Sequence, residues 1–334
     1  MSRASLRKSL CILGIGLSVV LFSVDFVCAQ SIVKGVTPRE NEPILPIPLH
    51  HEVNSAKAKL GEQLFHETLL SGDNSISCAS CHNIDQYGVD GTRSSVGIEG
   101  QVGTVNAPTV LNSRFNFAQF WDGRAEDLKE QAKGPVTNPI EMGSVWADVI
   151  AKLKKDKSYV QAFDNIYEEG ITPDTVADAI KNYEYTLTTV NSPFDQYLRG
   201  FDDAITEQQK RGYSLFKEYG CVACHQGVNV GGNMYQRMGA FIPYFTEKNT
   251  KLKADLGRYN VTKDDRDLHV FKVPSLRVAA HTAPYFHDGS VATLEEAIDI
   301  MARYQLGYTI SRQDNKDIAA FIQSLSGEIR RSGQ

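Results

Sequence analysis

Two short motifs in this chain combine the residue types that attach a metal cofactor covalently. Residues 78–82 (CASCH) and residues 221–225 (CVACH) each hold two cysteines separated by two residues and followed directly by a histidine. This spacing is typical of c-type haem attachment, because the two thiols form thioethers and the histidine binds the iron. Zinc is the alternative, but it favours a closed shell rich in thiolates, and the motifs begin 143 residues apart. We therefore expect two covalently bound c-type haems, held by Cys78, Cys81, His82, Cys221, Cys224 and His225.

The first 29 residues are typical of a cleaved secretion signal. Arg3, Arg7 and Lys8 precede a mostly apolar run over residues 10–22, which is short for a bilayer crossing, and the segment ends at Ala29. An uncleaved membrane anchor is the alternative. Cleavage would remove two of the six cysteines and leave four, all of them in the two motifs. We expect a periplasmic protein with no stable membrane anchor after cleavage.

The charge and length of the chain narrow the classes of partner and architecture. The formal charge is −5 for the whole sequence, and removing the basic signal leaves roughly −7. This acidity argues against nucleic acid as a partner and is compatible with a basic electron carrier. The length of 334 residues suits two domains once the signal is removed.

Segments of the first half of the chain recur in the second half at a constant offset of 166 residues. A constant offset of this kind indicates two copies of one haem domain. The matched pairs are residues 107–110 (APTV) with 273–276 (VPSL), 120–123 (FWDG) with 286–289 (FHDG), and 128–130 (LKE) with 294–296 (LEE).

The hydrophobic pattern predicts helices joined by long loops, without the alternation that a sheet requires. The fold is therefore expected to be all-α, with two tandem cytochrome-c-like haem domains related by internal duplication. We expect a first domain over residues 30–192 and a second over residues 193–334, whose last helix is able to pack back on the first. The helices are predicted over residues 173–187, 206–217, 294–304 and 311–325, and the long loops over 83–119 and 226–283.

Four longer segments carry a resemblance to a known family. Residues 106–109 (NAPT), 119–125 (QFWDGRA), 130–135 (EQAKGP) and 282–287 (TAPYFH) together resemble the bacterial dihaem cytochrome c peroxidases. The resemblance extends from about residue 60 to residue 325. It implies that the N-terminal haem is the low-potential haem that cleaves peroxide. It also implies that electrons enter at the high-potential C-terminal haem.

The resemblance assigns roles to individual residues. Met301 matches the sixth ligand of the C-terminal haem, and Trp121 matches the tryptophan between the two haems. Glu141 and Gln131 match the residues beside the peroxide, where a carboxylate can move a proton from the near oxygen to the far one as the O–O bond breaks. A calcium site between the domains and a homodimer are expected as well. The residues that match the calcium site are Asn106, Thr282 and Pro284.

One position departs from the family pattern. Members that need reductive activation place a histidine in the loop after the first motif, where it caps the resting peroxidatic iron. Ile98 occupies that place here, and isoleucine has no lone pair to ligate iron. We therefore expect a resting peroxidatic haem that is open or water-bound and needs little or no pre-reduction. Glu99 or the segment of His50 and His51 are the alternative sources of a weak cap.

The leading interpretation is an enzyme, a periplasmic cytochrome c peroxidase. It would reduce H2O2 to water with electrons from a small c-type cytochrome or a copper protein. One alternative is a dihaem oxygenase that matures a tryptophan-derived quinone in a partner protein. Relatives of that type have a tyrosine where Met301 stands, and Tyr304 and Tyr308 lie nearby. The other alternative is an electron carrier with both irons six-coordinate, which would leave Glu141 and Gln131 without a shared role.

Overall fold

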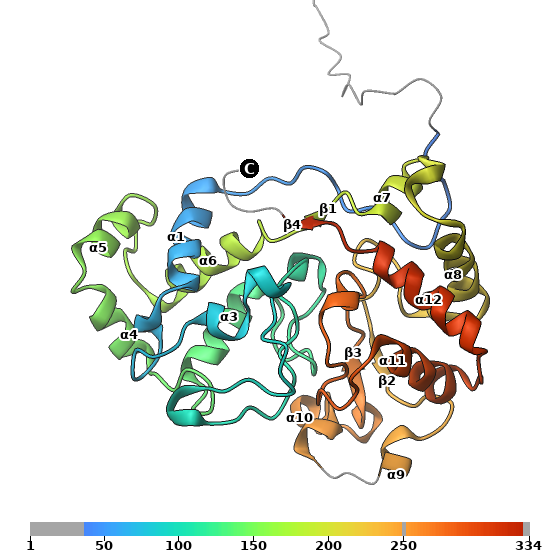
Figure 1. The fold of residues 1–334 in the computed structure, drawn as a ribbon. Helices are drawn as coiled ribbons and strands as arrows, with labels where there is room; N and C mark the ends of the chain where they lie inside the picture. The colour runs from blue at the N-terminus through green and yellow to red at the C-terminus, as the bar shows by residue number, and fades with distance from the viewer. Residues whose placement is uncertain (1–36, 249–251, 330–334) are drawn as a thin grey trace, which may run out of the picture. The chain divides into compact units, whose positions relative to one another are not determined.

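The computed structural model describes residues 37–248 and 252–329, so the predicted secretion signal lies outside the described residues. The described part is mostly helical (Figure 1), which confirms the predicted fold class. No helix among these residues has both the length and the apolar character of a bilayer crossing. The α-helices are α1 (Ser55–Phe65), α2 (Cys78–Cys81), α3 (Leu128–Thr137), α4 (Trp146–Leu153), α5 (Lys157–Asp164), α6 (Pro173–Glu184), α7 (Pro193–Leu198), α8 (Glu207–Glu218), α9 (Tyr244–Lys248), α10 (Tyr259–Thr262), α11 (Leu294–Ile300) and α12 (Arg312–Ser324).

Shorter elements connect these helices. A π-helical turn, Met301–Gln305, directly continues α11. Two small antiparallel pairs join β1 (Thr189–Val190) to β4 (Glu328–Ile329) and β2 (Tyr235–Arg237) to β3 (Val270–Lys272). The short 3-10 turns are Thr68–Leu70, Ile84–Gln86, Ile98–Gly100, Ser113–Phe115, Asp202–Ala204, Cys221–Ala223, Lys253–Leu256, Asp265–Asp267 and Ala279–His281.

Helices α1 and α6 pack closely against each other in the first half of the chain (Figure 1). Thr172 caps α6 by accepting a hydrogen bond from the amide of Thr175, and Pro173 stands at the first helical position, where its missing N–H costs nothing. A Cβ atom on Gly61 of α1 would lie 1.9 Å from the carbonyl oxygen of Ala179. The absence of a side chain at Gly61 therefore allows the two backbones to approach.

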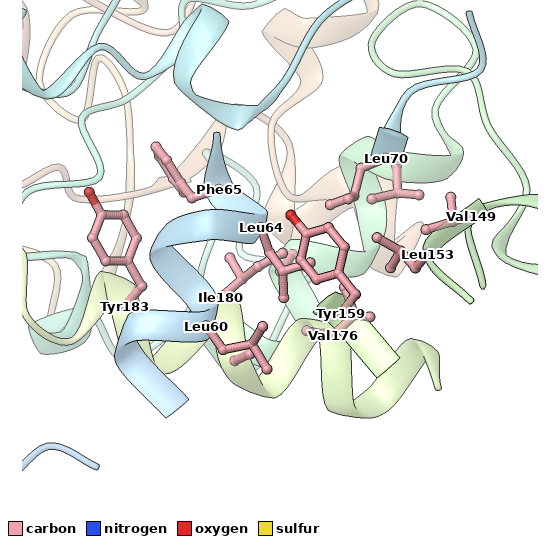
Figure 2. Packing of buried hydrophobic residues seen from close by; sticks show 14 of the residues in the cluster. Leu60, Leu64, Phe65, Leu70, Val149, Leu153, Tyr159, Val176, Ile180 and Tyr183 are labelled. Atoms are coloured by element: carbon pink, nitrogen blue, oxygen red, sulfur yellow. The ribbon is translucent and has the colours of Figure 1, made fainter. Parts of the chain in front are cut away.

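The same helix pair organises the core of the first half (Figure 2). Leu60 and Leu64 of α1 and Ile180 of α6 are buried together, and the cluster continues to Leu153 of α4 and Tyr159 of α5. These apolar residues recur three or four positions apart, so each helix buries one stripe of its surface. Burial of that stripe holds α1 and α6 in place beside the first CxxCH motif.

A second helix pair repeats this contact in the second half of the chain. Helices α8 and α12 pack against each other (Figure 1), and a Cβ atom on Gly212 of α8 would lie 1.9 Å from the carbonyl oxygen of Asp317. Ser311 caps α12, because its hydroxyl accepts a 3.0 Å hydrogen bond from the backbone amide of Asp314. Phe321 of α12 takes the place that Tyr183 has in the first pair.

Two large hydrophobic clusters form the main cores, and a small third cluster gathers Tyr244, Phe245 and Phe271. One large cluster gathers buried residues between Leu60 and Leu187, and the other gathers buried residues between Phe194 and Leu325. Each large cluster also takes one residue from the other end of the chain, Val278 in the first and Ile44 in the second. The large clusters divide close to residue 192, although a division of the protein into two domains stays a prediction.

Local structure recurs at the 166-residue offset of the sequence. The turn Ser113–Phe115 matches the turn Ala279–His281, and the bridge between Gln119 and Ala125 matches the bridge between Tyr285 and Val291. Phe120 and Phe286 both adopt left-handed backbone, with φ of 68° and 67°, a conformation that side chains rarely adopt. These matches support the predicted duplication, which stays a prediction.

Candidate active site

The first CxxCH motif forms a single helical turn that presents a histidine. Helix α2 holds both cysteines, and the amide of His82 donates a 3.0 Å hydrogen bond to the carbonyl of Cys78. The Nδ1 atom of His82 lies 3.2 Å from the carbonyl oxygen of Gly88. A ring N–H bonded to this carbonyl leaves Nε2 as the free donor for a metal. Burial lowers the pKa of His82, which favours the neutral imidazole that binds iron.

The second motif repeats this arrangement. The amide of His225 donates a 3.0 Å hydrogen bond to Cys221, and its Nδ1 atom lies 3.3 Å from the carbonyl oxygen of Val230. Burial lowers the pKa of His225 to about 4, so this imidazole is neutral at physiological pH. The four cysteines of the motifs form no disulfide. Two free thiols and one oriented neutral imidazole at each motif are the donor set that c-type haem requires.

A cavity of about 270 Å³ lies against the second motif. Its lining is mostly apolar and includes Cys221, His225 and Met301. The predicted pair of axial ligands, His225 and Met301, therefore borders one cavity, and Met301 is the first residue of the π-helical turn. Turns of this kind occur frequently at functional sites. The residues present fit a haem with one nitrogen and one sulfur ligand.

Trp121 belongs to the first half of the chain but lines the cavity beside the second motif. Its indole N–H donates a 2.9 Å hydrogen bond to the carbonyl oxygen of Asn106, and its own carbonyl accepts one of 2.9 Å from the amide of Lys272. These contacts fix the position of Trp121 within the set of residues around the second haem site.

Glu141 lies in a tight loop that folds back on the end of α3. The side-chain amide of Asn138 donates a 2.6 Å hydrogen bond to the Glu141 carboxylate. Burial raises the pKa of Glu141 above its usual range, while the Asn138 hydrogen bond and the charge of Arg124 oppose the rise. Burial also raises the pKa of the Cys81 thiol, and the carboxylate of Glu141 is close enough to add to that rise. Glu141 is therefore a half-buried carboxyl group near the first motif.

Gln131 belongs to the same local unit as Glu141. It is half-buried on α3, and the loop returns to that helix through a 3.2 Å hydrogen bond from the amide of Met142 to the carbonyl of Pro135. Among the described residues no hydrogen bond joins the side chains of Gln131 and Glu141. The structure thus brings the two residues into one unit without linking them directly.

The loop that follows the first motif is bound to the Glu141 segment. The amide of Ile98 donates a 2.9 Å hydrogen bond to the carbonyl oxygen of Glu141, and a Cβ atom on Gly97 would lie 2.3 Å from the carbonyl oxygen of Ile140. The Ile98 side chain packs over Gly143, where an added Cβ atom would lie 2.2 Å from Cδ1 of Ile98. The residue at the place where the resemblance expects a capping histidine is therefore apolar, and its backbone is bound to the Glu141 segment.

The predicted calcium residues come together only in part. The side-chain amide of Asn106 donates a 2.9 Å hydrogen bond to the carbonyl oxygen of Pro284, so these two groups are near enough to share a cation. The Thr282 hydroxyl instead donates a 3.5 Å hydrogen bond to the carbonyl of Ala279. Backbone and amide oxygens are suitable ligands for calcium, but this arrangement alone does not require a cation.

Several polar groups near these sites have no signal in the sequence. Asn138 and Arg124 both oppose the rise in the pKa of Glu141; Asn138 belongs to none of the matched motifs, and Arg124 lies in the 119–125 motif, where the sequence assigned it no role. Glu184 is buried on α6 with one carboxylate oxygen unpaired, and Lys272 is buried beside the second motif. A three-residue cluster also forms from Asp255, His287 and Asp288, whose ligand atoms lie within 4.8 Å of one another.

Comparison with known proteins places the chain among relatives of one family. A family model for di-haem cytochrome c peroxidase matches residues 55–203. The cytochrome c551 peroxidase of Nitrosomonas europaea is 44% identical over 289 residues, which cover 86% of this chain and 85% of the relative. The cytochrome c peroxidase Ccp of Escherichia coli is 48% identical over 288 residues, and the match spans 86% of this chain but only 62% of that protein.

A solved structure has the same fold over most of the chain. The crystal structure of a MauG-like protein associated with microbial copper homeostasis superposes with a TM-score of 0.72. It is 28% identical in sequence, and the match covers 87% of this chain and 95% of that one. With identities of 44% and 48% to curated peroxidases, the chain belongs to the di-haem cytochrome c peroxidase family, whose members are oxidoreductases.

Proposed function

We propose that the protein reduces H2O2 to two molecules of water at the haem attached to Cys78 and Cys81. The observation that carries this proposal is the Glu141 carboxyl group, which is held by Asn138 near the first motif with a raised pKa. A carboxyl group whose pKa is raised toward the working pH is suited to both accept and return a proton. The haem iron would bind the peroxide and take part in its two-electron reduction.

The residues of the chain would move the proton and exclude competing reactions. Glu141 accepts the proton from the oxygen nearer the iron and gives it to the far oxygen, which leaves as water. The Asn138 amide keeps the accepting carboxylate oxygen oriented through its 2.6 Å hydrogen bond. Gln131, on the adjoining helix, would position the peroxide. Two electrons and two protons complete the balance for each H2O2 consumed.

Electrons would enter through the second site. His225 and Met301 line one cavity and would both bind the iron of a haem held there, so that this haem would pass electrons without binding substrate. A small c-type cytochrome or a copper protein is the expected donor. Trp121, held between Asn106 and Lys272, would lie on the route to the first haem.

We propose further that the peroxidatic haem is open in the resting oxidised enzyme. Ile98 stands beside Glu141 and offers no ligand atom. Two other histidines stack on aromatic rings: His281 on Tyr87 in the loop after the first motif, with ring centroids 4.0 Å apart, and His269 on Phe245 at 4.4 Å. Little or no pre-reduction would then be needed. A periplasmic location, a homodimer and one Ca²⁺ at Asn106 and Pro284 complete the proposal.

A maturation enzyme of the MauG type is the second candidate, because a MauG-like structure shares the fold. The local geometry favours the peroxidase. Met301 lines the cavity, whereas the Tyr304 hydroxyl donates a 2.7 Å hydrogen bond to Glu247 and Tyr308 is 48% exposed. Unlike Met301, neither Tyr304 nor Tyr308 lines the cavity beside the second motif.

Steady-state reduction of H2O2 by a reduced small cytochrome tests the proposed function. The wild-type protein should turn over rapidly, and Glu141→Gln should not. Glu126→Gln, at an exposed position close to α3, is the matched control and should retain wild-type rates. A wild-type protein with both haems and no turnover would support the electron carrier instead. Slow turnover with that donor would support a maturation enzyme.

A further inference from the structure

Lys272 is a buried cation without a partner in the described part of the chain. It is the last residue of β3 and is only 8% exposed. Its backbone is well bonded, since its amide donates to the carbonyl oxygen of Trp121 at 2.9 Å. Its ammonium group, in contrast, has no hydrogen-bond or ion-pair partner among the described residues, and the side chain borders a cavity and is not fully enclosed by protein atoms. Burying an unpaired charge costs free energy. An anion from outside the polypeptide, placed next to this ammonium group, would offset that cost.

The surroundings of Lys272 point to where that anion would lie. The side chain borders the cavity that Cys221, Cys224, His225 and Met301 also line. Burial alone lowers the pKa of Lys272 to about 8, and no carboxylate is near enough to oppose that shift. Burial thus disfavours the charged form of this amine, and a nearby negative charge would favour it again.

Among the described residues, no Asp or Glu side chain lines this cavity. The other titratable groups along it include Arg237 and His287, in addition to the proximal His225. The Arg237 guanidinium donates a 2.8 Å hydrogen bond to the carbonyl of Arg266, and the ring of His287 is paired with Asp255 at 2.7 Å. Lys272 is thus the cation of this lining that has no protein acceptor. A ligand that fills the cavity should carry a negative charge close to it.

We propose that Lys272 binds a propionate carboxylate of the haem attached to Cys221 and Cys224. This proposal rests on the part of the proposed function that places a haem at the second motif. A c-type haem bears two carboxylates on the edge away from its thioether bonds, and an ammonium–carboxylate contact satisfies both buried charges. The contact would anchor that edge of the haem beside Trp121, whose carbonyl holds the Lys272 backbone.

The contact has a consequence for electron entry. Reduction adds one negative charge to the haem, and a fixed cation in a poorly solvated site stabilises the added charge. Lys272 would therefore raise the reduction potential of the second haem relative to a site without the cation. It is a positioning and tuning residue, since it acts on the cofactor edge and not on peroxide.

Three substitutions in the holoenzyme separate charge from packing. Lys272→Met removes the charge with a side chain of similar length, Lys272→Gln keeps a hydrogen-bond donor, and Lys272→Arg keeps the charge. Lys253→Met, at an exposed lysine, is the control for loss of one positive charge elsewhere. Haem content, the resonance Raman propionate bending bands and the reduction potential of the His/Met haem are measured for each protein without peroxide.

Lys272→Met and Lys272→Gln should shift the propionate bands and lower the potential, so that a given donor leaves about tenfold less of the second haem reduced at equilibrium. Lys272→Arg and Lys253→Met should match the wild type in potential. If Lys272→Met fails to assemble, the Lys272→Gln protein supplies the decisive comparison. Normal haem content with unchanged bands and potential in the uncharged variants would overturn the proposal. Absence of peroxide turnover would not, because none of these readouts depends on it.

Discussion

The amide nitrogen of Ile98 lies 2.9 Å from the carbonyl oxygen of Glu141. These residues are far apart in sequence, and the hydrogen bond fixes the loop after the first CxxCH motif against the loop that carries the proposed proton-transfer group. The Ile98 side chain packs over Gly143 and keeps the loop apolar on that side. The proposed open resting state of the first haem follows from this contact, since the residue at this place has no ligand atom.

Replacing Ile98 by histidine should create a capped enzyme. Ile98→His places an imidazole in the loop bound to the Glu141 segment, and under the proposal this imidazole would bind the iron of the first haem. We expect the oxidised variant to lose high-spin signal and to show a lag in peroxide reduction that pre-reduction with one electron removes. Ile98→Val is the control and should behave as the wild type. An Ile98→His enzyme without a lag and with unchanged spin state would contradict the assignment of this loop.

Glu141→Gln should lower kcat/KM for H2O2 by about 10²–10⁴-fold, the usual contribution of a positioned acid–base group. The visible spectra of both haems should be unchanged, because the carboxyl group is not an iron ligand. Stopped-flow mixing with H2O2 measures the effect. A loss of less than about threefold would exclude Glu141 as the proton carrier.

The pH profile provides a separate check on Glu141. Burial raises its pKa, and the ionised form is the one that accepts the proton from peroxide. The rate should therefore fall as the pH drops through this raised pKa, at a higher pH than an ordinary glutamate would cause. In Glu141→Gln the acidic limb of the profile should disappear. Persistence of the same limb in the variant would assign it to another group.

Glu184 should make the stability of the protein depend on pH. Burial raises its pKa from the usual 4.5 to about 8, so the folded state retains a proton that the unfolded state loses. Its contribution to stability is full below about pH 4.5 and is lost as the pH rises toward about 8. We expect Glu184→Gln to stabilise the protein at pH 8 by about 1–3 kcal/mol and to flatten this dependence. Urea unfolding at several pH values measures it, with the exposed Glu169→Gln as a control that should change neither.

The close crossing of α1 and α6 should be sensitive to a single methyl group. A Cβ atom on Gly61 would lie 1.9 Å from a backbone carbonyl oxygen, which cannot move aside without shifting α6. We expect Gly61→Ala to lower the free energy of unfolding by about 1–3 kcal/mol, despite the better helix propensity of alanine. Lys59→Ala, on the exposed face of the same helix, should change it by less than about 0.5 kcal/mol. Equal effects of the two substitutions on the free energy of unfolding would contradict the close approach of α1 and α6 at Gly61.

Patterns among residues close together in the sequence were sufficient to predict several of the helices. The sequence predicts helices over 173–187 and 311–325, and the structure has Pro173–Glu184 and Arg312–Ser324, capped at their N-terminal ends by Thr172 and Ser311. The predicted helix over 294–304 is present, but its last turn widens into the π-helical turn that begins at Met301. Propensity and spacing describe an α-helix and carry no signal for such a turn.

Contacts between distant segments could not be predicted in this way. Strands β1 and β4 have two residues each, too few to show the alternation that identifies a strand. Lysine is a residue type that is usually exposed, and Lys272 is buried because β3 packs beside Trp121. The pairing of Asn138 with Glu141 is local, but an asparagine before a proline reads first as a turn residue.

The measurement that tests the account most directly is electron paramagnetic resonance of the oxidised protein, repeated after reduction by one electron. Two unequal haems are the central claim: one with an open position beside Glu141 and Ile98, and one closed by His225 and Met301. The account predicts one high-spin and one low-spin ferric haem in the oxidised protein, with only the low-spin signal lost on half-reduction. Two fully low-spin ferric haems in the oxidised protein would contradict it.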